Sequence, residues 1–229
     1  MKCYAAKNKD LQTRLNSSSG GIFTLLAEQM INDGGNVIGV NDEIEHQSIN
    51  KVEDIHLLQG SKYVECKTNY DLIDKHTMLV GTPCQMSKKA YLNVDLVCHG
   101  TPTRNSYDKY LEIHDKFKFR DKKNGWIGST AKNEFMGDFL NDRNLCDKCY
   151  KCPFKNFKSI SDIQIGDFWG IQNEYPDFFD NYGVSLVIIK TDKGEQMFDK
   201  IKDKLEYIDI DINKAIKYNP SIIISAERK

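Results

Sequence analysis

The sequence has no long hydrophobic run and no surplus of charge of either sign. One of its most apolar stretches, residues 184–189, is far shorter than the roughly 20 residues that a transmembrane helix needs. The 32 Lys and Arg residues are balanced by 33 Asp and Glu residues, whereas proteins that bind nucleic acid through bulk charge carry a basic surplus. We therefore expect a protein that binds neither a membrane nor nucleic acid.

Other common signals are also missing. Residues 1–5 lack the apolar segment of a secretion signal, and the sequence contains no evident repeat or low-complexity tract. With 229 residues, of which 40% are apolar and 28% charged, the chain is too apolar for a disordered protein and long enough to bury a core. These features predict a cytoplasmic globular protein.

Short apolar segments separated by turns predict an α/β fold. We expect strands at residues 36–40, 63–66, 78–80, 94–98, 161–165 and 184–189. We expect helices from residue 22 to a stop at 33–35 and at 51–58, 85–92, 104–116 and 194–205, with a charged turn at 120–126. Strand–turn–helix units in series indicate a mixed or mostly parallel sheet flanked by helices. The cysteine-bearing segment 146–152 is expected to be an irregular loop.

Two of the seven cysteines, Cys84 and Cys98, each lie at or just past the end of a predicted strand. The chain is too large to need disulfides, and its odd cysteine count points away from a disulfide framework. In an open α/β sheet, ligands gather at the carboxyl ends of the strands, and neighbouring strands are about 4.8 Å apart. Two thiolates placed there can hold one small inorganic group. The alternative is that each is simply a small buried hydrophobic residue.

A second cysteine group, Cys146, Cys149 and Cys152, has three-residue spacing. Two residues between thiolates let a tight loop aim both sulfurs at one centre, as in zinc knuckles and iron–sulfur loops. With the two strand-end cysteines, Cys149 and Cys152 form a two-plus-two ligand set, and Cys146 is an extra candidate. Zinc is the competing interpretation, because His99 follows Cys98, although zinc ribbons usually supply both ligand pairs as C-x-x-C knuckles.

The polar segment 17–21 runs directly into the first predicted helix. Helix N-termini present unpaired N–H groups, and glycines allow close approach of a phosphate; a flexible linker or an ordinary helix cap is the alternative. The sequence contains neither G-x-G-x-x-G nor a P-loop motif, so a nucleotide must be held in another way. Trp169 can stack on a planar cofactor or anchor the core. Lys62 can pair with an anionic ligand or lie free on the surface.

Six motifs in this order resemble the family of coenzyme F-420 hydrogenase/dehydrogenase beta subunits. The resemblance extends from about Tyr4 to Leu205. The matching segments are Ser17-Ser18-Ser19-Gly20-Gly21-Ile22-Phe23, Gly60-Ser61-Lys62-Tyr63-Val64, Gly81-Thr82-Pro83-Cys84-Gln85, Asp95-Leu96-Val97-Cys98-His99-Gly100, Cys149-Tyr150-Lys151-Cys152 and Gly166-Asp167-Phe168-Trp169-Gly170.

The resemblance implies a flavin-dependent oxidoreductase with FAD and one 4Fe–4S cluster in a single catalytic domain over residues 1–229. By motif, the flavin would be bound by Ser18, Ser19, Gly20, Gly21, Lys62, Gly81, Thr82 and Pro83, and the cluster by Cys84, Cys98, Cys149 and Cys152. No residue is assigned a catalytic role.

The resemblance also implies a small-molecule redox substrate, with coenzyme F-420 as a candidate. The ferredoxin-like segment that many members carry ahead of the Ser-Ser-Gly-Gly turn is expected to be absent, which leaves a ferredoxin-like protein as a candidate electron partner. Two alternatives stay open. One is a zinc-stabilised, non-catalytic accessory protein with the same fold, and the other is electron transfer through the cluster alone.

Overall fold

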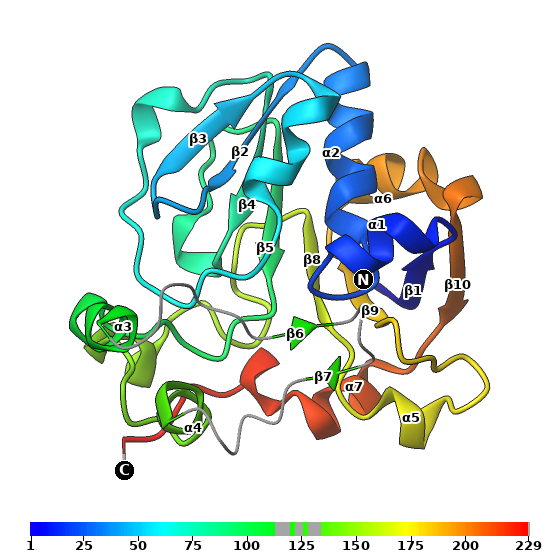
Figure 1. Cartoon of the computed structure of the whole chain (residues 1–229). Helices are drawn as coiled ribbons and strands as arrows, with labels where there is room; N and C mark the ends of the chain where they lie inside the picture. The colour runs from blue at the N-terminus through cyan, green and yellow to red at the C-terminus, as the bar shows by residue number, and fades with distance from the viewer. Residues whose placement is uncertain (113–119, 122–125, 128–133, 229) are drawn as a thin grey trace.

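The computed structural model describes residues 1–112, 120–121, 126–127 and 134–228. An eight-stranded sheet with the order β10-β1-β9-β8-β5-β4-β2-β3 runs through this part of the chain (Figure 1). Its strands are β1 (Lys2–Asn8), β2 (Asn36–Val40), β3 (His46–Ile49), β4 (Thr77–Gly81), β5 (Leu92–Leu96), β8 (Ile163–Asp167), β9 (Ser185–Ile189) and β10 (Leu205–Asp209). The short strands β6 (Arg120–Asp121) and β7 (Trp126–Ile127) form a separate pair.

The centre of the sheet is parallel and its borders are antiparallel. Strands β2, β4, β5 and β8 run in one direction, whereas β3 pairs antiparallel with β2, and β9, β1 and β10 continue antiparallel from β8. Of the two expected forms, a mixed or a mostly parallel sheet, the structure shows the mixed one with a parallel centre, and the predicted α/β fold with flanking helices is confirmed. Because four neighbouring strands are parallel, their carboxyl ends lie along one edge of the sheet, where α/β proteins bind ligands.

Helices cover both faces of the sheet. On one face, Leu26 of α2 and Phe198 of α6 pack in the same buried cluster as Ile163 of β8. On the other face, Ile171 of α5 packs with Leu186 of β9. The helices are α1 (Leu11–Asn16), α2 (Ile22–Asn32), α3 (Arg104–Leu111), α4 (Glu134–Leu140), α5 (Ile171–Glu174), α6 (Asp192–Asp199) and α7 (Ile212–Tyr218). Within the described residues, no helix has the length and apolar character that a membrane span requires.

The predicted helix at 85–92 is wrong. A single 3-10 turn, Pro83–Gln85, follows β4, and β5 already begins at Leu92. The Ser87 N–H donates to Asn93 Oδ1 over 2.9 Å, and Asn93 Nδ2 donates to the Ser87 carbonyl over 3.0 Å. This side chain bridges the backbone across a tight connection, so the segment is too compact for a helix.

Several other boundaries differ from the predicted ones. Residues 63–66 form no strand but belong to the wall of a cavity described below, and the strand expected at 94–98 is β5, which ends at Leu96. The helix expected at 194–205 ends as α6 at Asp199, because Leu205 starts the edge strand β10. Helix α3 ends at Leu111, and the rest of the predicted helix at 113–116 falls outside the described residues. The ends of the predicted turn at 120–126 pair as β6 and β7, and its middle, 122–125, is likewise outside them.

The centre of the sheet makes a direct prediction about stability. Ile163 is fully buried between parallel β5 and antiparallel β9, so Ile163→Ala should lower the free energy of unfolding by about 2–5 kcal/mol, as large-to-small core substitutions do. Ile160 is 46% exposed, and Ile160→Ala should change it by no more than about 0.5 kcal/mol. Urea denaturation measures both values. Equal losses for the two variants would contradict this packing.

Candidate functional site

A cavity of about 880 Å³ opens at the carboxyl edge of the parallel strands. Val40, Gly81, Leu96 and Ile165, which lie at or near the ends of β2, β4, β5 and β8, all line it. The loop between α1 and α2 and the segment 58–68 form further parts of the wall. The volume lies within the range of small-molecule and cofactor sites.

The Ser-Gly loop (residues 17–21) joins α1 to α2, and four of its residues line the cavity. Gly21 is the N-cap of α2 in the left-handed region (φ 82°), and no side chain caps the helix there. The first-turn N–H groups of the 11-residue helix α2 are therefore not satisfied by a side-chain cap. Gly20 is the residue of the loop that does not line the cavity. It packs closely against neighbouring backbone, since a Cβ there would be 2.5 Å from the Ala6 carbonyl oxygen and 2.8 Å from the Ser185 nitrogen.

The serine hydroxyls of this loop make bonds within the protein. Ser17 Oγ donates to the Thr13 carbonyl over 2.7 Å, and Ser19 Oγ donates to the Val184 carbonyl over 3.0 Å. Ser61 Oγ, in the neighbouring segment 58–68, donates to Ser18 Oγ over 3.2 Å. These hydroxyls therefore fix the shape of the loop, and the first-turn N–H groups of α2 are left without a side-chain cap at the cavity.

Of the other residues expected near a flavin, Lys62, Gly81 and Thr82 line this cavity, whereas Pro83 does not. Lys62 lines the cavity with a side chain that is only 11% exposed, and its Nζ lies 3.4 Å from Asp42 Oδ1. Burial lowers the pKa of Lys62 despite that carboxylate. Gly81 and Thr82 line the same wall, where Thr82 N–H donates to Gln85 Oε1 over 2.9 Å. Pro83 borders a neighbouring, smaller cavity.

That smaller cavity gathers four cysteines from three separate segments. Cys84 follows β4, Cys98 follows β5, and Cys149 and Cys152 come from the 3-10 segment Asp147–Lys151 and its end. Cys84 and Cys98 line both the cysteine cavity and the large one. The two spaces therefore share a wall built from the ends of two adjacent parallel strands.

The protein around Cys98 and Cys149 disfavours ionisation of these two thiols in the absence of a positive centre. The pKa of Cys98 is raised to about 12, chiefly by burial and also by the thiolates of Cys149, Cys84 and Cys152, while the Lys155 ammonium opposes the shift. Burial also raises the pKa of Cys149, although Thr101 N–H donates to its sulfur over 3.3 Å. Four negative sulfurs in one cavity repel each other unless cations such as metal ions compensate them.

Lys155 is a functional candidate that sequence reasoning missed. Its Nζ donates to the carbonyl oxygens of Cys98 and Ser221, the latter over 2.7 Å, and the residue lines the cysteine cavity. The ammonium thus brings a positive charge to the backbone of a candidate ligand. Nothing in the local sequence indicated this role, because residue 155 is 57 positions from residue 98.

Cys146 does not belong to the cysteine cavity. Its sulfur faces Glu65 Oε2 at 3.5 Å and the Pro102 carbonyl at 3.7 Å, and the residue is absent from the lining of both described cavities. Cys3 is buried within β1, and Cys66 Sγ bonds the Ile44 carbonyl over 3.3 Å. Within the described part of the chain, no three His, Cys, Asp or Glu side chains converge closely enough to hold one metal ion.

His99 and Trp169, the residues considered as a zinc ligand and as a stacking partner for a planar cofactor, lie in different surroundings. His99 lines both cavities, its Nε2 lies 2.7 Å from Asp142 Oδ1, and its ring meets Phe139 edge-on at 5.0 Å. Trp169 is 43% exposed and lines the large cavity, whereas the preceding Phe168 is buried in the core. Of this aromatic pair, Phe168 is thus the core anchor and Trp169 is open to a ligand.

Comparisons with known proteins agree on one group. Residues 74–213 match the family described as the C terminus of the beta subunit of coenzyme F420 hydrogenase/dehydrogenase. The F subunit of the F(420)H(2) dehydrogenase of Methanosarcina mazei is 25% identical over an aligned length of 246 residues. The match covers 91% of this chain and 65% of that protein. The chain therefore spans slightly less than two thirds of the length of that relative.

A solved structure shares the fold. A chain in a xenon-derivatised structure of the F420-reducing [NiFe] hydrogenase complex from Methanosarcina barkeri is similar with a TM-score of 0.68 and 17% identity. The match covers 96% of this chain and 90% of that one.

The cysteine environments predict an order of alkylation in the reduced, metal-free chain. Cys84 is exposed, whereas Cys98 and Cys149 have raised pKa values and Cys3 is buried with its pKa raised to about 11. At about pH 8.5, near the pKa of a free thiol, iodoacetamide should label Cys84 first and Cys3, Cys98 and Cys149 far more slowly. Peptide mass spectrometry over time measures the order. Labelling of Cys98 as fast as Cys84 would contradict the described enclosure.

Proposed function

The chain belongs to the family of coenzyme F420 hydrogenase/dehydrogenase beta subunits, and from this premise we propose that it is a flavin-dependent iron–sulfur oxidoreductase. It passes electrons between a reduced cofactor or substrate, FAD and a 4Fe–4S cluster. Family membership implies redox electron transfer. The observation that carries the finer proposal is the lining of one cavity by four cysteines, directly beside a larger cavity at the carboxyl edge of the sheet.

The donor set fits an iron–sulfur cluster. A 4Fe–4S cluster is held by four cysteine thiolates, each bound to its own iron, so its ligands surround a space and do not converge on a single ion. Cys84, Cys98, Cys149 and Cys152 line such a space. Lys155 places a positive charge beside Cys98, and charge and hydrogen bonds around a cluster set its potential.

The large cavity fits a flavin nucleotide. The uncapped start of α2 offers N–H groups and a partial positive charge to phosphates, and Lys62 supplies a buried cation in the same wall. Gly81 and Thr82 also line this cavity, three and two positions, respectively, before Cys84 at the shared wall. When bound, the flavin supplies two-electron chemistry and the cluster single-electron transfer.

The residues of this chain would orient the two groups and limit their contact with water. Cys84 and Cys98 border both cavities, so only protein side chains at a shared wall would separate flavin from cluster. Trp169 leaves an aromatic face open at the large cavity and suits a second planar group. We propose reduced coenzyme F-420 as the candidate substrate, in line with the name of the Methanosarcina mazei relative, and a ferredoxin-like protein as the electron partner.

Metal and flavin content tests this proposal directly. The chain purified without oxygen should contain about four irons per chain, acid-labile sulfide and FAD released by heat. One zinc with neither iron nor flavin would favour the non-catalytic accessory protein instead, and iron without FAD would leave electron transfer through the cluster alone.

Substitution of single cysteines tests the ligand set. Cys149→Ser should remove most of the iron and the visible absorption of the cluster, because one of the four proposed ligands is lost. Cys146→Ala is the matched control from the same segment, since its sulfur faces Glu65 and Pro102, and it should keep the iron content of the wild type. Iron analysis and absorption spectra measure both. Equal iron in the two variants would refute the assignment of Cys149.

A further inference from the structure

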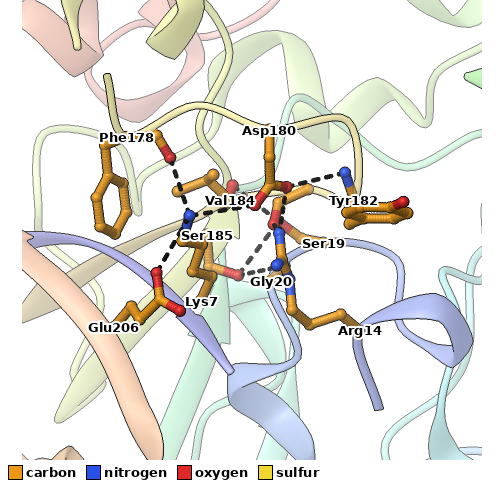
Figure 2. A network of polar contacts seen from close by, with 11 residues as sticks. Lys7, Arg14, Ser19, Gly20, Phe178, Asp180, Tyr182, Val184, Ser185 and Glu206 are labelled. Carbon is orange, nitrogen blue, oxygen red and sulfur yellow. Dashed lines mark hydrogen bonds and ion pairs between the residues drawn. The ribbon is translucent and has the colours of Figure 1, made fainter. Parts of the chain in front are cut away.

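A network of ion pairs lies behind the Ser-Gly loop (Figure 2). Arg14 of α1 pairs with Asp180 Oδ1 and donates from Nη2 to the Gly183 carbonyl over 2.9 Å. Lys7 of β1 reaches the other oxygen of the same carboxylate over 3.1 Å and the Phe178 carbonyl over 3.3 Å. Two cations from the start of the chain therefore hold the segment 178–183 in place.

That segment leads directly into the residues that bond the Ser-Gly loop. Ser19 Oγ donates to the Val184 carbonyl over 3.0 Å, and Ser185 Oγ accepts the Gly20 N–H over 2.9 Å. On its other side the loop is bonded by β1, where Asn8 N–H donates to the Gly20 carbonyl over 2.8 Å. The position of the loop thus depends on residues 184–185. The position of these two residues depends in turn on Asp180, which anchors the segment that precedes them.

The network is mostly enclosed. The side chains of Arg14, Lys7 and Asp180 are 8%, 12% and 27% exposed. Burial favours protonation of Asp180, but Arg14, the Tyr182 N–H and Lys7 outweigh it and hold the pKa of this carboxyl below its usual range. The carboxylate is therefore ionised at neutral pH. Removal of its charge would leave a poorly solvated guanidinium without this carboxylate, which is costly.

Arg14, Lys7 and Asp180 are all absent from the lining of the large cavity, so they act on a ligand only through the loop. None of the residues 17–21 lines the cysteine cavity. The loop therefore serves a part of the ligand other than the part beside the cysteines. Within FAD, that part is the diphosphate, which suits the uncapped N-terminus of α2.

We propose that Asp180 and Arg14 are positioning residues that fix the Ser-Gly loop in the shape that binds the diphosphate of FAD. This inference rests on the proposed function and deepens it. It distinguishes two flavins, because riboflavin has the same ring system as FAD and no phosphate. Loss of the network should weaken FAD binding and leave riboflavin binding intact, whereas general destabilisation would weaken both.

The test compares binding of FAD and riboflavin by the flavin-free full chain, measured without oxygen by flavin fluorescence. Asp180→Asn keeps the size of the side chain and removes its charge. It should raise the Kd for FAD about tenfold, which corresponds to about 1.4 kcal/mol. The Kd for riboflavin should not change. Asp177→Asn, a substitution at the exposed position directly before the segment 178–183, is the matched control and should leave both values unchanged.

Two conservative variants guard against misfolding of Asp180→Asn. Asp180→Glu retains the carboxylate and should recover part of the FAD affinity, and Arg14→Lys retains the charge with fewer donors and should show a smaller loss that is again confined to FAD. Equal losses for FAD and riboflavin, or no loss for FAD, would overturn the positioning role. A wild-type chain that binds riboflavin and FAD with the same Kd would also overturn the positioning role, because the phosphates would then contribute nothing to binding. If the wild-type chain binds no flavin at all, the proposed function fails, and this inference fails with it.

Discussion

Parallel pairing of β4, β5 and β8 is the constraint on which the site depends. Gly81 pairs with Asp95, and Leu96 with Ile165, so the three strands end at nearly the same level. Residues just beyond those ends must emerge together at one edge of the sheet. The backbone hydrogen bonds of the core thus bring Cys84 and Cys98 into one wall, although 13 residues separate them in sequence.

The gathered thiols have an electrostatic cost that the fold only partly offsets. Burial and repulsion by neighbouring thiolates raise the pKa of Cys98 and Cys149, whereas Lys155 opposes the shift at Cys98 and the Thr101 N–H opposes it at Cys149. Such a cavity is poorly suited to four bare thiolates and well suited to thiolates that bind metal, since metal binding releases the thiol protons. Cys146 is not part of this set, because it does not line the cysteine cavity and its sulfur faces the Glu65 carboxylate.

At the large cavity, the edge that we propose to bind a ligand is supported by residues that do not line the cavity. The Ser-Gly loop uses its serine hydroxyls for internal bonds and leaves the start of α2 without a side-chain cap. An enclosed ion-pair network then fixes the segment against which the loop rests (Figure 2). The serine hydroxyls of this short loop thus make structural bonds, and the uncapped N–H groups of α2 are the groups that we propose to bind the ligand.

Local pattern determined several parts of this protein from the sequence alone. The apolar spacing from Ile22 gives α2, the glycine pair before it gives the uncapped helix start, and the apolar runs give β2, β4, β8 and β9 to within two residues. Motif order was enough to indicate the family, which the comparisons confirm. Each of these features depends on residues that are close together in the chain.

Tertiary structure alone decided the rest. Strand β1 was not predicted, because its buried Ala5 and Ala6 have little strand propensity and it is held by pairing with β9 and β10, about 180 to 200 positions away. In place of the helix expected at 85–92, the chain forms a tight connection in which the Asn93 side chain bonds the backbone of Ser87. Lys155 beside Cys98, and Arg14 beside Asp180, join residues 57 and 166 positions apart. Spacing within the sequence reports which local structure a segment prefers, but long-range pairing follows from packing of the whole chain, so these contacts leave no local signal.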